Sequence, residues 1–423
     1  MPNSRDKPDA LDGFPLEHWL QLCTLAREHP GRVREALVVG GAEPVYLGKG
    51  LAHLQPLVAH QVRLRPRVAR KFDDPAGWLW TDGLLQLASD DRVAALTAGF
   101  FPKGARVFDI GCGGGADALA LLGRGPVAAV DREELPLALA AANAALQAEG
   151  GRRFGGPLES IHSDAAELTV GGDDLLHLDP DRRGEGGQRS VQLRWHSPDE
   201  TTLLRLIGES RGGSVKLAPG CRDEPPSEIA DVTRQWVGVD RGVVQQRWWW
   251  GIDGFPAGGR RVSALVGPDW HHFDVPADRW REAVAGELSD VVTEEFPSPG
   301  SWLGDGDPTL RAADCQGVYA AAHGYELLGN EMGYFAADAP ANDPSSDPLV
   351  RWFRLEDAAP LDARKLRRLV QSMGRDGIVL KTRNVRSVPE PLVKWAAKPA
   401  KNPAVVMATA FGGRHWALVV KPA

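Results

Sequence analysis

The sequence predicts an α/β protein whose centre is a doubly wound parallel sheet. Four short, strand-like stretches, each with an aspartate at or next to its end, follow one another at 107–110, 127–130, 160–163 and 175–178. Helical patterns separate the first three, notably 135–147, and a run of glycines follows the first. Strands that alternate with helices favour a parallel sheet that binds its ligand at the carboxyl ends of the strands.

Length and composition restrict the class of protein. A chain of 423 residues suggests two or three domains. Its hydrophobic content of 43% and charged content of 25% are typical of soluble globular proteins. No apolar run approaches the roughly 20 residues that span a bilayer, and the first residues lack the apolar stretch of a signal peptide. The cysteines, at positions 23, 112, 221 and 315, form no Cys-x-x-Cys pair. We therefore expect a cytoplasmic protein with no metal site, no disulfide framework and no membrane partner.

The chain before the sheet is expected to form an N-terminal helical lobe over residues 1–95. Helical patterns such as Leu16–Glu28 occupy much of residues 11–70. A basic stretch, Arg63-Leu64-Arg65-Pro66-Arg67, then leads toward the sheet domain, which we expect over residues 96–270.

The first strand delivers a carboxylate into a glycine loop. Asp109 stands two residues before Gly111, and the loop continues through Gly113 to Gly115. Glycines let a backbone approach a ligand closely. A loop that binds a dinucleotide must accept a pyrophosphate, which a carboxylate at this place would repel. The same carboxylate suits an ammonium group, and S-adenosyl-L-methionine (SAM) carries one and has no phosphate.

Two further acids follow at spacings that fit one nucleoside. Asp131 ends the second strand about 20 residues beyond the glycines, where a carboxylate binds ribose hydroxyls. Asp164 ends the third strand and is placed to accept from the adenine amino group. Taken singly, each acid reads equally well as a turn or helix cap. The other expected cofactor contacts are Thr81, Cys112, Arg132 and Ala165.

The fourth strand ends in Asp179-Pro180, which we expect on the catalytic, methyl-accepting side. The alternative is that Asp179 caps a helix or supports the cofactor indirectly. Amine-methylating enzymes use an Asp/Asn-Pro-Pro-aromatic loop, and this chain lacks its second proline and its ring. Arg182 and Arg183 follow and are candidates to hold a nucleic-acid phosphate; a solvated loop is the alternative.

Three other features have weaker functional interpretations. Cys221 is a possible nucleophile for pyrimidine methylation, but no His or Lys adjoins it, so an ordinary loop cysteine is favoured. The run Trp248-Trp249-Trp250 places two indoles on one face of a strand and one on the other, and packing is favoured over RNA stacking. His271-His272 lacks the spacing of metal ligands, so we assign no metal.

The sequence of the second half predicts the last strands of the sheet, a small insert and a C-terminal domain. Residues 235–239, 243–250 and 261–266 read as late antiparallel strands, and 271–350 as a small α+β insert. In the last part, 351–423, Asp362 is placed to cap a helix over residues 363–373. A strand at 377–382, a short helix at 390–397 and a hairpin around Gly412-Gly413 follow.

Charge is distributed unevenly along the chain. The net charge is −7, yet residues 361–423 contain 13 Lys and Arg against 3 Asp and Glu, which leaves −17 on the rest. Such asymmetry indicates a tail that meets polyanions, and we expect RNA. The usual alternative is a solvated helical face. The candidate RNA-binding residues of this tail are Arg364, Lys365, Arg367, Arg368, Lys381 and Arg383.

Several motifs together resemble one family, the class I SAM-dependent methyltransferases that carry a C-terminal THUMP-like domain. The motifs are Phe72-Asp73-Asp74-Pro75, Trp80-Thr81-Asp82-Gly83-Leu84, the glycine loop, Leu178-Asp179-Pro180-Asp181-Arg182-Arg183, Val215-Lys216-Leu217-Ala218-Pro219-Gly220 and Leu366-Arg367-Arg368-Leu369. The resemblance implies a Rossmann-like methyltransferase sheet, a small α+β THUMP-like domain at 351–423, and SAM held by Asp109, Gly111, Gly113 and Asp131. It also implies RNA binding, because THUMP domains bind RNA, but no particular substrate.

The sequence therefore predicts a SAM-dependent methyltransferase that acts on structured RNA. One alternative is a nicotinamide-dependent oxidoreductase that uses Gly111-x-Gly113-x-x-Ala116 as its fingerprint. The other is a non-catalytic RNA-binding protein that retains a SAM-binding fold.

Overall fold

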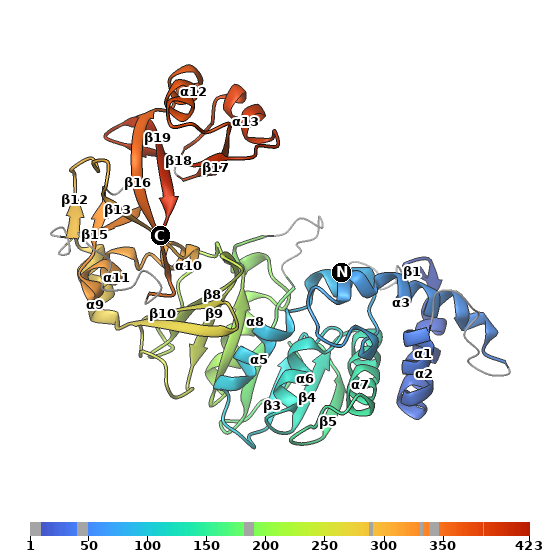
Figure 1. Ribbon diagram of the computed structural model, residues 1–423. Coiled ribbons are helices and arrows are strands. Elements are labelled where there is room, and N and C mark those ends of the chain that lie inside the picture. Colours follow the sequence, from blue (N-terminus) through green and yellow to red (C-terminus); the bar gives the residue numbers. More distant parts are fainter. Residues whose placement is uncertain are drawn as a thin grey trace. The chain divides into compact units, whose positions relative to one another are not determined.

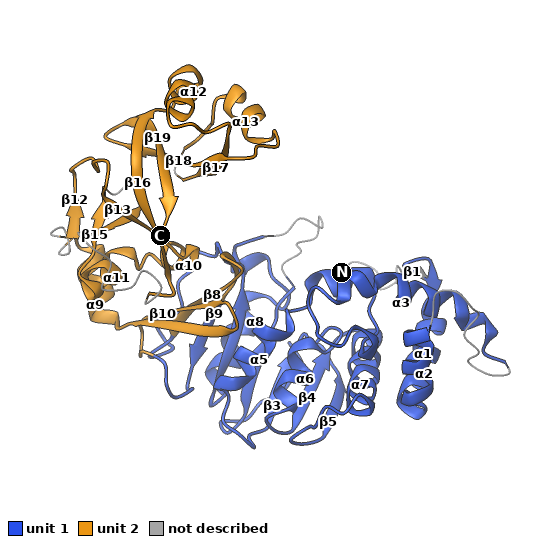
Figure 2. Cartoon of the chain, viewed as in Figure 1, with its two compact units in different colours: residues 1–232, 247–255 blue, residues 233–246, 256–423 orange. Residues whose placement is uncertain are grey.

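The computed structural model describes residues 10–39, 50–181, 190–286, 291–329, 333–337, 347–383 and 385–423. The chain divides into two compact units (Figure 2). Unit 1 comprises Met1–Val232 and Arg247–Phe255, and unit 2 comprises residues 233–246 and Pro256–Ala423. The finer division into four parts stays a prediction. Within the described ranges, no helix combines the length and the apolar character needed to cross a bilayer.

Unit 1 begins with helices that pack on one another and on a later helix. They are α1 (Leu16–Glu28), α2 (Pro30–Val39), α3 (Gln55–Val68), α4 (Asp82–Leu87) and α5 (Asp91–Phe100), preceded by the short strands β1 (Ala10–Leu11) and β2 (Phe14–Pro15). The predicted helix 16–28 is confirmed as α1. Its apolar face, with Trp19 and Leu22 fully buried, joins Leu139 and Leu146 of α7 (Glu134–Glu149) in one core cluster.

The centre of unit 1 is the parallel sheet that the sequence predicts. Its order is β5 (Leu158–His162), β4 (Val127–Asp131), β3 (Val107–Ile110), β6 (Leu175–Leu178), β7 (Gly212–Leu217), and then the end of β9 (Gly242–Trp250). The pairs β4–β5, β3–β4, β3–β6 and β6–β7 are all parallel. Figure 1 shows α6 (Ala116–Leu122) and α7 beside β3 and β4, and α8 (Glu200–Glu209) precedes β7. Since β4 and β6 flank β3 on opposite sides, the strand order reverses at β3, where such sheets bind ligands.

The tryptophan run belongs to the core, as favoured from the sequence. Trp248 and Trp250 join the apolar cluster on one face of the sheet, and Trp249 joins the cluster on the other face. Trp249 stacks on Phe255 with ring centroids 4.6 Å apart. All three indoles are buried, so none is presented for RNA stacking.

Unit 2 contains the strands that follow. Asp240 and Arg241, both with positive φ, form the two-residue turn between β8 (Thr233–Val239) and β9. The expectation that the late strands are all antiparallel is wrong. β10 (Arg260–Val266) pairs in parallel with β8 and antiparallel only with β11 (Asp269–Val275), because the chain reverses direction twice between β8 and β10.

The rest of unit 2 forms an eight-stranded sheet. Its order is β12 (Val292–Thr293), β14 (Glu326–Leu328), β15 (Tyr334–Ala337), β13 (Trp302–Gly306), β16 (Val350–Pro360), β19 (Arg414–Pro422), β18 (Pro403–Phe411) and β17 (Gly377–Thr382). Its helices are α9 (Ala277–Val284), α10 (Pro308–Ala312), α11 (Gln316–His323), α12 (Ala363–Ser372) and α13 (Glu390–Ala396). Asp362 caps α12 as expected, because its carboxylate accepts from the backbone N–H groups of Arg364 and Lys365.

Candidate functional site

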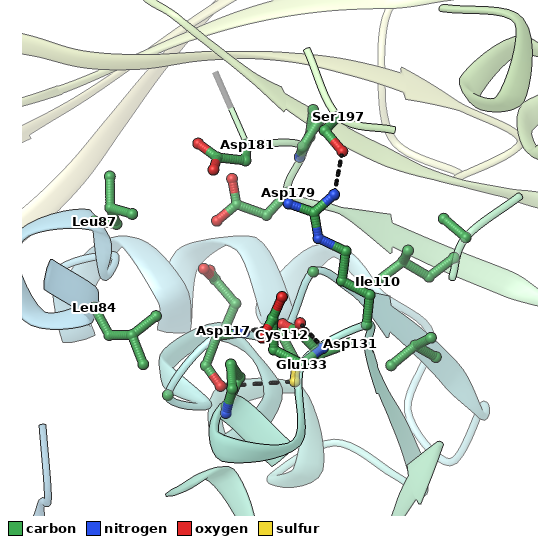
Figure 3. Close-up of a pocket in the computed structure, with 18 of the residues that line it drawn as sticks. Leu84, Leu87, Ile110, Cys112, Asp117, Asp131, Glu133, Asp179, Asp181 and Ser197 are labelled. Carbon is green, nitrogen blue, oxygen red and sulfur yellow. Dashed lines mark hydrogen bonds between the residues drawn. The ribbon is translucent and has the colours of Figure 1, made fainter. Parts of the chain in front are cut away.

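A cavity of about 250 Å³ opens at the carboxyl ends of β3, β4 and β6 (Figure 3). Residues 110–114, 130–133, 163–165 and 179–181 line it from the sheet and its loops. Trp80, Leu84, Leu87, Ala88, Ser89, Ala116, Asp117, Pro136, Ser197 and Pro198 complete the wall. The sequence places Asp131, Asp164 and Asp179 at or just after the ends of β4, β5 and β6, and the fold brings these acids to one edge.

The glycine loop follows the sheet closely because side chains do not fit there. Gly111 has φ +81°, and a Cβ on it would lie 2.6 Å from the carbonyl oxygen of Asp179. A Cβ on Gly114 would overlap the Trp80 ring. Gly115 has φ +90° and packs against Ala140 rather than facing the cavity. The loop is therefore held between Trp80 on one side and the Asp179 backbone on the other.

Two predicted nucleoside contacts line the cavity with fixed carboxylates. Asp131 Oδ2 accepts from Gly113 N at 3.3 Å, and Oδ1 accepts from Glu133 N at 3.0 Å. Burial raises the pKa of Asp131, and these two hydrogen bonds oppose that effect. Asp164 Oδ1 accepts from Ala166 N at 2.9 Å and is more exposed. Both acids thus stand at strand ends with oxygens fixed by backbone donors.

The neighbours of these acids also line the cavity. Arg132 is in the wall, and its Nη1 donates to Ser197 Oγ at 3.1 Å. Cys112 lines the cavity too, and burial together with Asp109 and Asp131 raises the pKa of its thiol well above the usual value. A thiol in this state is a poor nucleophile.

Three hydrogen-bonded side chains, Asp109, His177 and Arg247, lie beneath the cavity, and the sequence did not predict this arrangement. His177 Nδ1 lies 2.8 Å from Asp109 Oδ1, and Arg247 Nη1 lies 2.9 Å from His177 Nε2. A guanidinium only donates, so His177 Nε2 accepts and its proton is on Nδ1, which donates to Asp109. All three side chains are almost fully buried. Burial raises the pKa of Asp109, and the contact with His177 opposes this.

A second set of contacts joins these three side chains to residues of the cavity wall. Lys216 Nζ donates to Asp179 Oδ2 at 2.7 Å and to Ser89 Oγ at 3.0 Å. Ser89 in turn donates to Asp117 Oδ2 at 2.6 Å. Arg247 Nη2 lies 3.7 Å from Asp117 Oδ1. The carboxylate of the Asp-Pro loop is therefore fixed by a buried ammonium.

Nine of the twelve predicted cofactor-binding and catalytic residues line the cavity, but three do not. Gly111, Cys112, Gly113, Asp131, Arg132, Asp164, Ala165, Asp179 and Pro180 are all in its wall. Asp109 lies below, on His177. Gly115 packs on α7, and Thr81 caps α4 by accepting from Leu84 N at 3.1 Å. Arg182 and Arg183 fall outside the described residues. The functional role assigned to each residue stays a prediction.

The sequence reasoning missed Asp117, Ser89, Lys216 and Arg247. Lys216 stood inside a motif quoted for the resemblance, but nothing local pairs it with Asp179. Cys221 is buried, its Sγ lies 3.8 Å from Asp223 Oδ2, and it is not part of the cavity wall. This agrees with the favoured interpretation of an ordinary loop cysteine.

One other group of ligand-type side chains occurs in the described part of unit 1. His60 Nε2 lies 3.6 Å from both Asp12 Oδ2 and Asp82 Oδ2, in an arrangement that could hold a metal ion. Arg67 also pairs with Asp82, and the Asp82 N–H donates to Asp12 at 2.7 Å. Arg67 and a backbone N–H already contact these carboxylates, so we assign no metal to them.

The basic residues of the tail have two different environments. Arg364, Lys365, Arg367 and Arg368 are exposed on α12, whose Leu366 and Val370 face the core. Lys381 is half-buried, with its Nζ 4.9 Å from the Phe353 ring centroid. Arg383 forms an ion pair with Asp305 and donates to the Gly333 carbonyl at 2.9 Å. Arg383 thus stabilises unit 2, and among the candidate RNA-binding residues of the tail the exposed cations are the four of α12.

Comparison with known proteins agrees with this architecture. Residues 350–422 match the family model for THUMP domain-like sequences. A crystallised protein of Porphyromonas gingivalis W83, provisionally assigned as a methyltransferase, is similar over 97% of this chain and 99% of its own, with 16% identity and a TM-score of 0.70. No curated protein matches the chain.

Two other solved structures are similar over less of the chain. One, from Listeria monocytogenes and provisionally assigned as a class I SAM-dependent methyltransferase, has 11% identity, coverage of 64% and 97%, and a TM-score of 0.35. The other, from Pyrococcus horikoshii and provisionally assigned as an RNA methyltransferase, has 19% identity, coverage of 32% and 60%, and a TM-score of 0.22. The likeness to the Porphyromonas gingivalis protein and the family model confirm the expected fold and the expected THUMP-like part. The chain shares the Rossmann-like fold of that protein, and residues 350–422 are THUMP-like.

Proposed function

We propose that this protein is a SAM-dependent methyltransferase that acts on structured RNA. The observation that carries the proposal is the charge of the cavity wall. Among the residues that the structure describes, six carboxylates line it, on Asp117, Asp131, Glu133, Asp164, Asp179 and Asp181, against one cation, Arg132. A pyrophosphate would meet this wall with repulsion, whereas a ligand with a sulfonium and an ammonium group would meet attraction.

The residues present fit such a ligand. Asp131 would accept from the ribose hydroxyls, and Asp164 would accept from the adenine amino group. Ile110, Val130, Leu84, Leu87 and Pro136 supply apolar surface for a base. The wall also contains a buried carboxylate oxygen, Asp117 Oδ1, with no hydrogen-bond partner among the described residues. A buried acceptor without a partner is uncommon in folded proteins, and a donor on the ligand would satisfy this one.

The residues on the acceptor side can orient a nucleophile. When bound, SAM supplies a methyl group activated by its sulfonium. Asp179 accepts a hydrogen bond from Lys216, which fixes the orientation of its carboxylate. The remaining lone pairs of this carboxylate can accept a hydrogen bond from an N–H or O–H of the methyl-accepting substrate. The neighbouring Asp181 is tied to Ser197 by two backbone hydrogen bonds of 2.8 and 2.9 Å, which fixes the loop. Acceleration would come mainly from such positioning.

Direct binding tests the cofactor. Calorimetry of the full chain should give saturable binding of SAM and of S-adenosylhomocysteine, and no binding of NADH at the same concentrations. Binding of NADH without SAM would establish the oxidoreductase alternative. Transfer of labelled methyl groups from SAM into RNA from a strain that lacks the protein separates an enzyme from a non-catalytic RNA-binding protein.

The exposed cations of α12 support RNA as the partner. Phosphate contacts dominate RNA affinity and make it depend on salt. The variant R364E/K365E/R367E/R368E should therefore lose RNA retention and its salt dependence. A control with the same charge change, K398E/K401E/R414E/K421E, reverses exposed cations elsewhere in the tail and should retain most of the affinity. If the α12 variant binds RNA like the wild type, the proposal that these cations bind RNA is wrong.

A further inference from the structure

We infer that Asp117 receives the ammonium group of the methionine end of SAM, with Asp109 only supporting it from below. This inference rests on the proposed function. It assigns a binding role to a residue that no sequence motif singled out, and it moves the ammonium contact from the strand to the helix that follows the glycine loop.

The sheet topology places the two ends of the ligand. Asp131 and Asp164 follow β4 and β5, which lie on one side of β3. Asp179 and Lys216 belong to the ends of β6 and β7, on the other side. A ligand whose nucleoside lies over β4 and β5 therefore directs its other end across the glycine loop toward β6 and β7. Asp117 lies on that side, because its Oδ2 is 3.8 Å from Lys216 Nζ.

The hydrogen bonds of Asp117 leave room for one strong donor. The residue is buried, with 7% of its surface exposed, and it lines the cavity. Oδ2 accepts from Ser89 at 2.6 Å. Oδ1 has no hydrogen-bond partner in the described chain, since Arg247 and His177 Nε2 stand 3.7 and 3.9 Å away. A buried carboxylate oxygen without a hydrogen bond costs free energy until a donor arrives, and an ammonium group supplies three N–H donors.

The charge state of Asp117 suits that donor. Burial opposes ionisation, but Lys216, His177, Arg247 and the Ser89 hydroxyl outweigh it and lower the pKa of Asp117 to about 2. The side chain is therefore a carboxylate at any physiological pH. Its two cationic neighbours lie beyond hydrogen-bond distance of Oδ1, so they stabilise the charge without occupying that oxygen.

Asp109 is less suited to the same role. Its Oδ1 accepts from His177, and its Oδ2, like Asp117 Oδ1, has no hydrogen-bond partner among the described residues, but unlike Asp117 it is not in the cavity wall. The pKa of Asp109 is raised, chiefly by burial, whereas the neighbouring cations and the Ser89 hydroxyl lower that of Asp117. Asp109 is thus a positioning residue: it orients His177, whose other nitrogen accepts from Arg247, the side chain that stands beside Asp117.

A calorimetric comparison of two ligands tests the assignment. S-adenosylhomocysteine carries the amino-acid end, and 5′-methylthioadenosine lacks it. We expect D117N to weaken S-adenosylhomocysteine binding at least tenfold, which equals about 1.4 kcal/mol, and to change methylthioadenosine binding less than twofold. The control D253N alters an exposed aspartate of the same unit and should change neither affinity.

Each outcome decides between the two proposals. If the wild type binds neither ligand, the proposed function fails. If D117N binds S-adenosylhomocysteine as the wild type does, or loses both ligands equally, the assignment of Asp117 fails while the function stands. Should D117N not fold, calorimetry measures how tightly the wild type binds S-adenosylhomocysteine and its deaminated analogue, which lacks the ammonium group. The same two affinities are then measured for S89A. Equal affinity of the wild type for these two ligands overturns the assignment. An affinity for the deaminated analogue that is tenfold lower or more, with a smaller difference between the two ligands in S89A, supports it.

Discussion

The buried ammonium of Lys216 allows a quantitative prediction for unit 1. K216M removes the donor of two hydrogen bonds, to Asp179 at 2.7 Å and to Ser89 at 3.0 Å, and the nearest cation to Asp117 Oδ2, 3.8 Å away. Breaking a buried pair from one side costs about 3–5 kcal/mol, and a hydrogen bond to a charged group contributes about 1.5–3 kcal/mol. Because the Asp179 side chain is 27% exposed, water replaces part of the loss.

We therefore expect K216M to lower the free energy of unfolding by about 2–4 kcal/mol. For a unit of this size that corresponds to a decrease in Tm of roughly 4–16 °C. Differential scanning calorimetry suits the measurement, since two compact units can melt separately. K216R keeps the charge and should lose less. K103M removes an exposed lysine of the same unit and should melt like the wild type. If K216M and K103M melt at the same temperature, Lys216 has no such role.

Three other predictions follow from the cavity wall. G114A should destabilise the protein by about 1–3 kcal/mol, because its Cβ would overlap the Trp80 ring, whereas G99A, in an open position of α5, should be neutral or stabilising by up to about 1 kcal/mol; equal denaturant midpoints for both would contradict this. Burial raises the pKa of Asp131, so S-adenosylhomocysteine affinity should be constant at higher pH and decline as the pH falls through that raised pKa, above the range of an ordinary aspartate. D131N should remove this dependence, and an identical pH profile in calorimetry would show that another group titrates. Burial raises the pKa of Cys112, so iodoacetamide at about pH 8 should leave it unmodified in the native protein; rapid alkylation seen by mass spectrometry would refute its burial.

The sheet of unit 1 was predictable because its signals are local. The strands β3, β4 and β6 are short apolar stretches, each strand from β3 to β6 has an acid near or just after its end, and the boundaries of α12 follow from the Asp362 cap and Gly374. The positions of Asp131, Asp164 and Asp179 in one wall then follow from the topology alone, since parallel strands bring their carboxyl ends to one edge.

The buried charges were not predictable because their partners are distant in sequence. Asp117 and Lys216 are far apart along the chain, and only the pairing of β3, β6 and β7 brings them together. Asp109 reads from the sequence as a ligand contact, yet its partner, His177, comes from β6. The parallel pairing of β8 and β10, and the pairing of β13 with β16 across the boundary we had set near residue 350, are likewise non-local.

The most direct test of the account is a crystal structure of the full chain with S-adenosylhomocysteine. We expect the ribose hydroxyls within hydrogen-bond distance of Asp131, the adenine amino group at Asp164, and the ammonium group at Asp117 Oδ1. An empty cavity at saturating ligand, or a nucleoside bound away from Asp131 and Asp164, would contradict the central claim that this acidic cavity binds a sulfonium nucleoside.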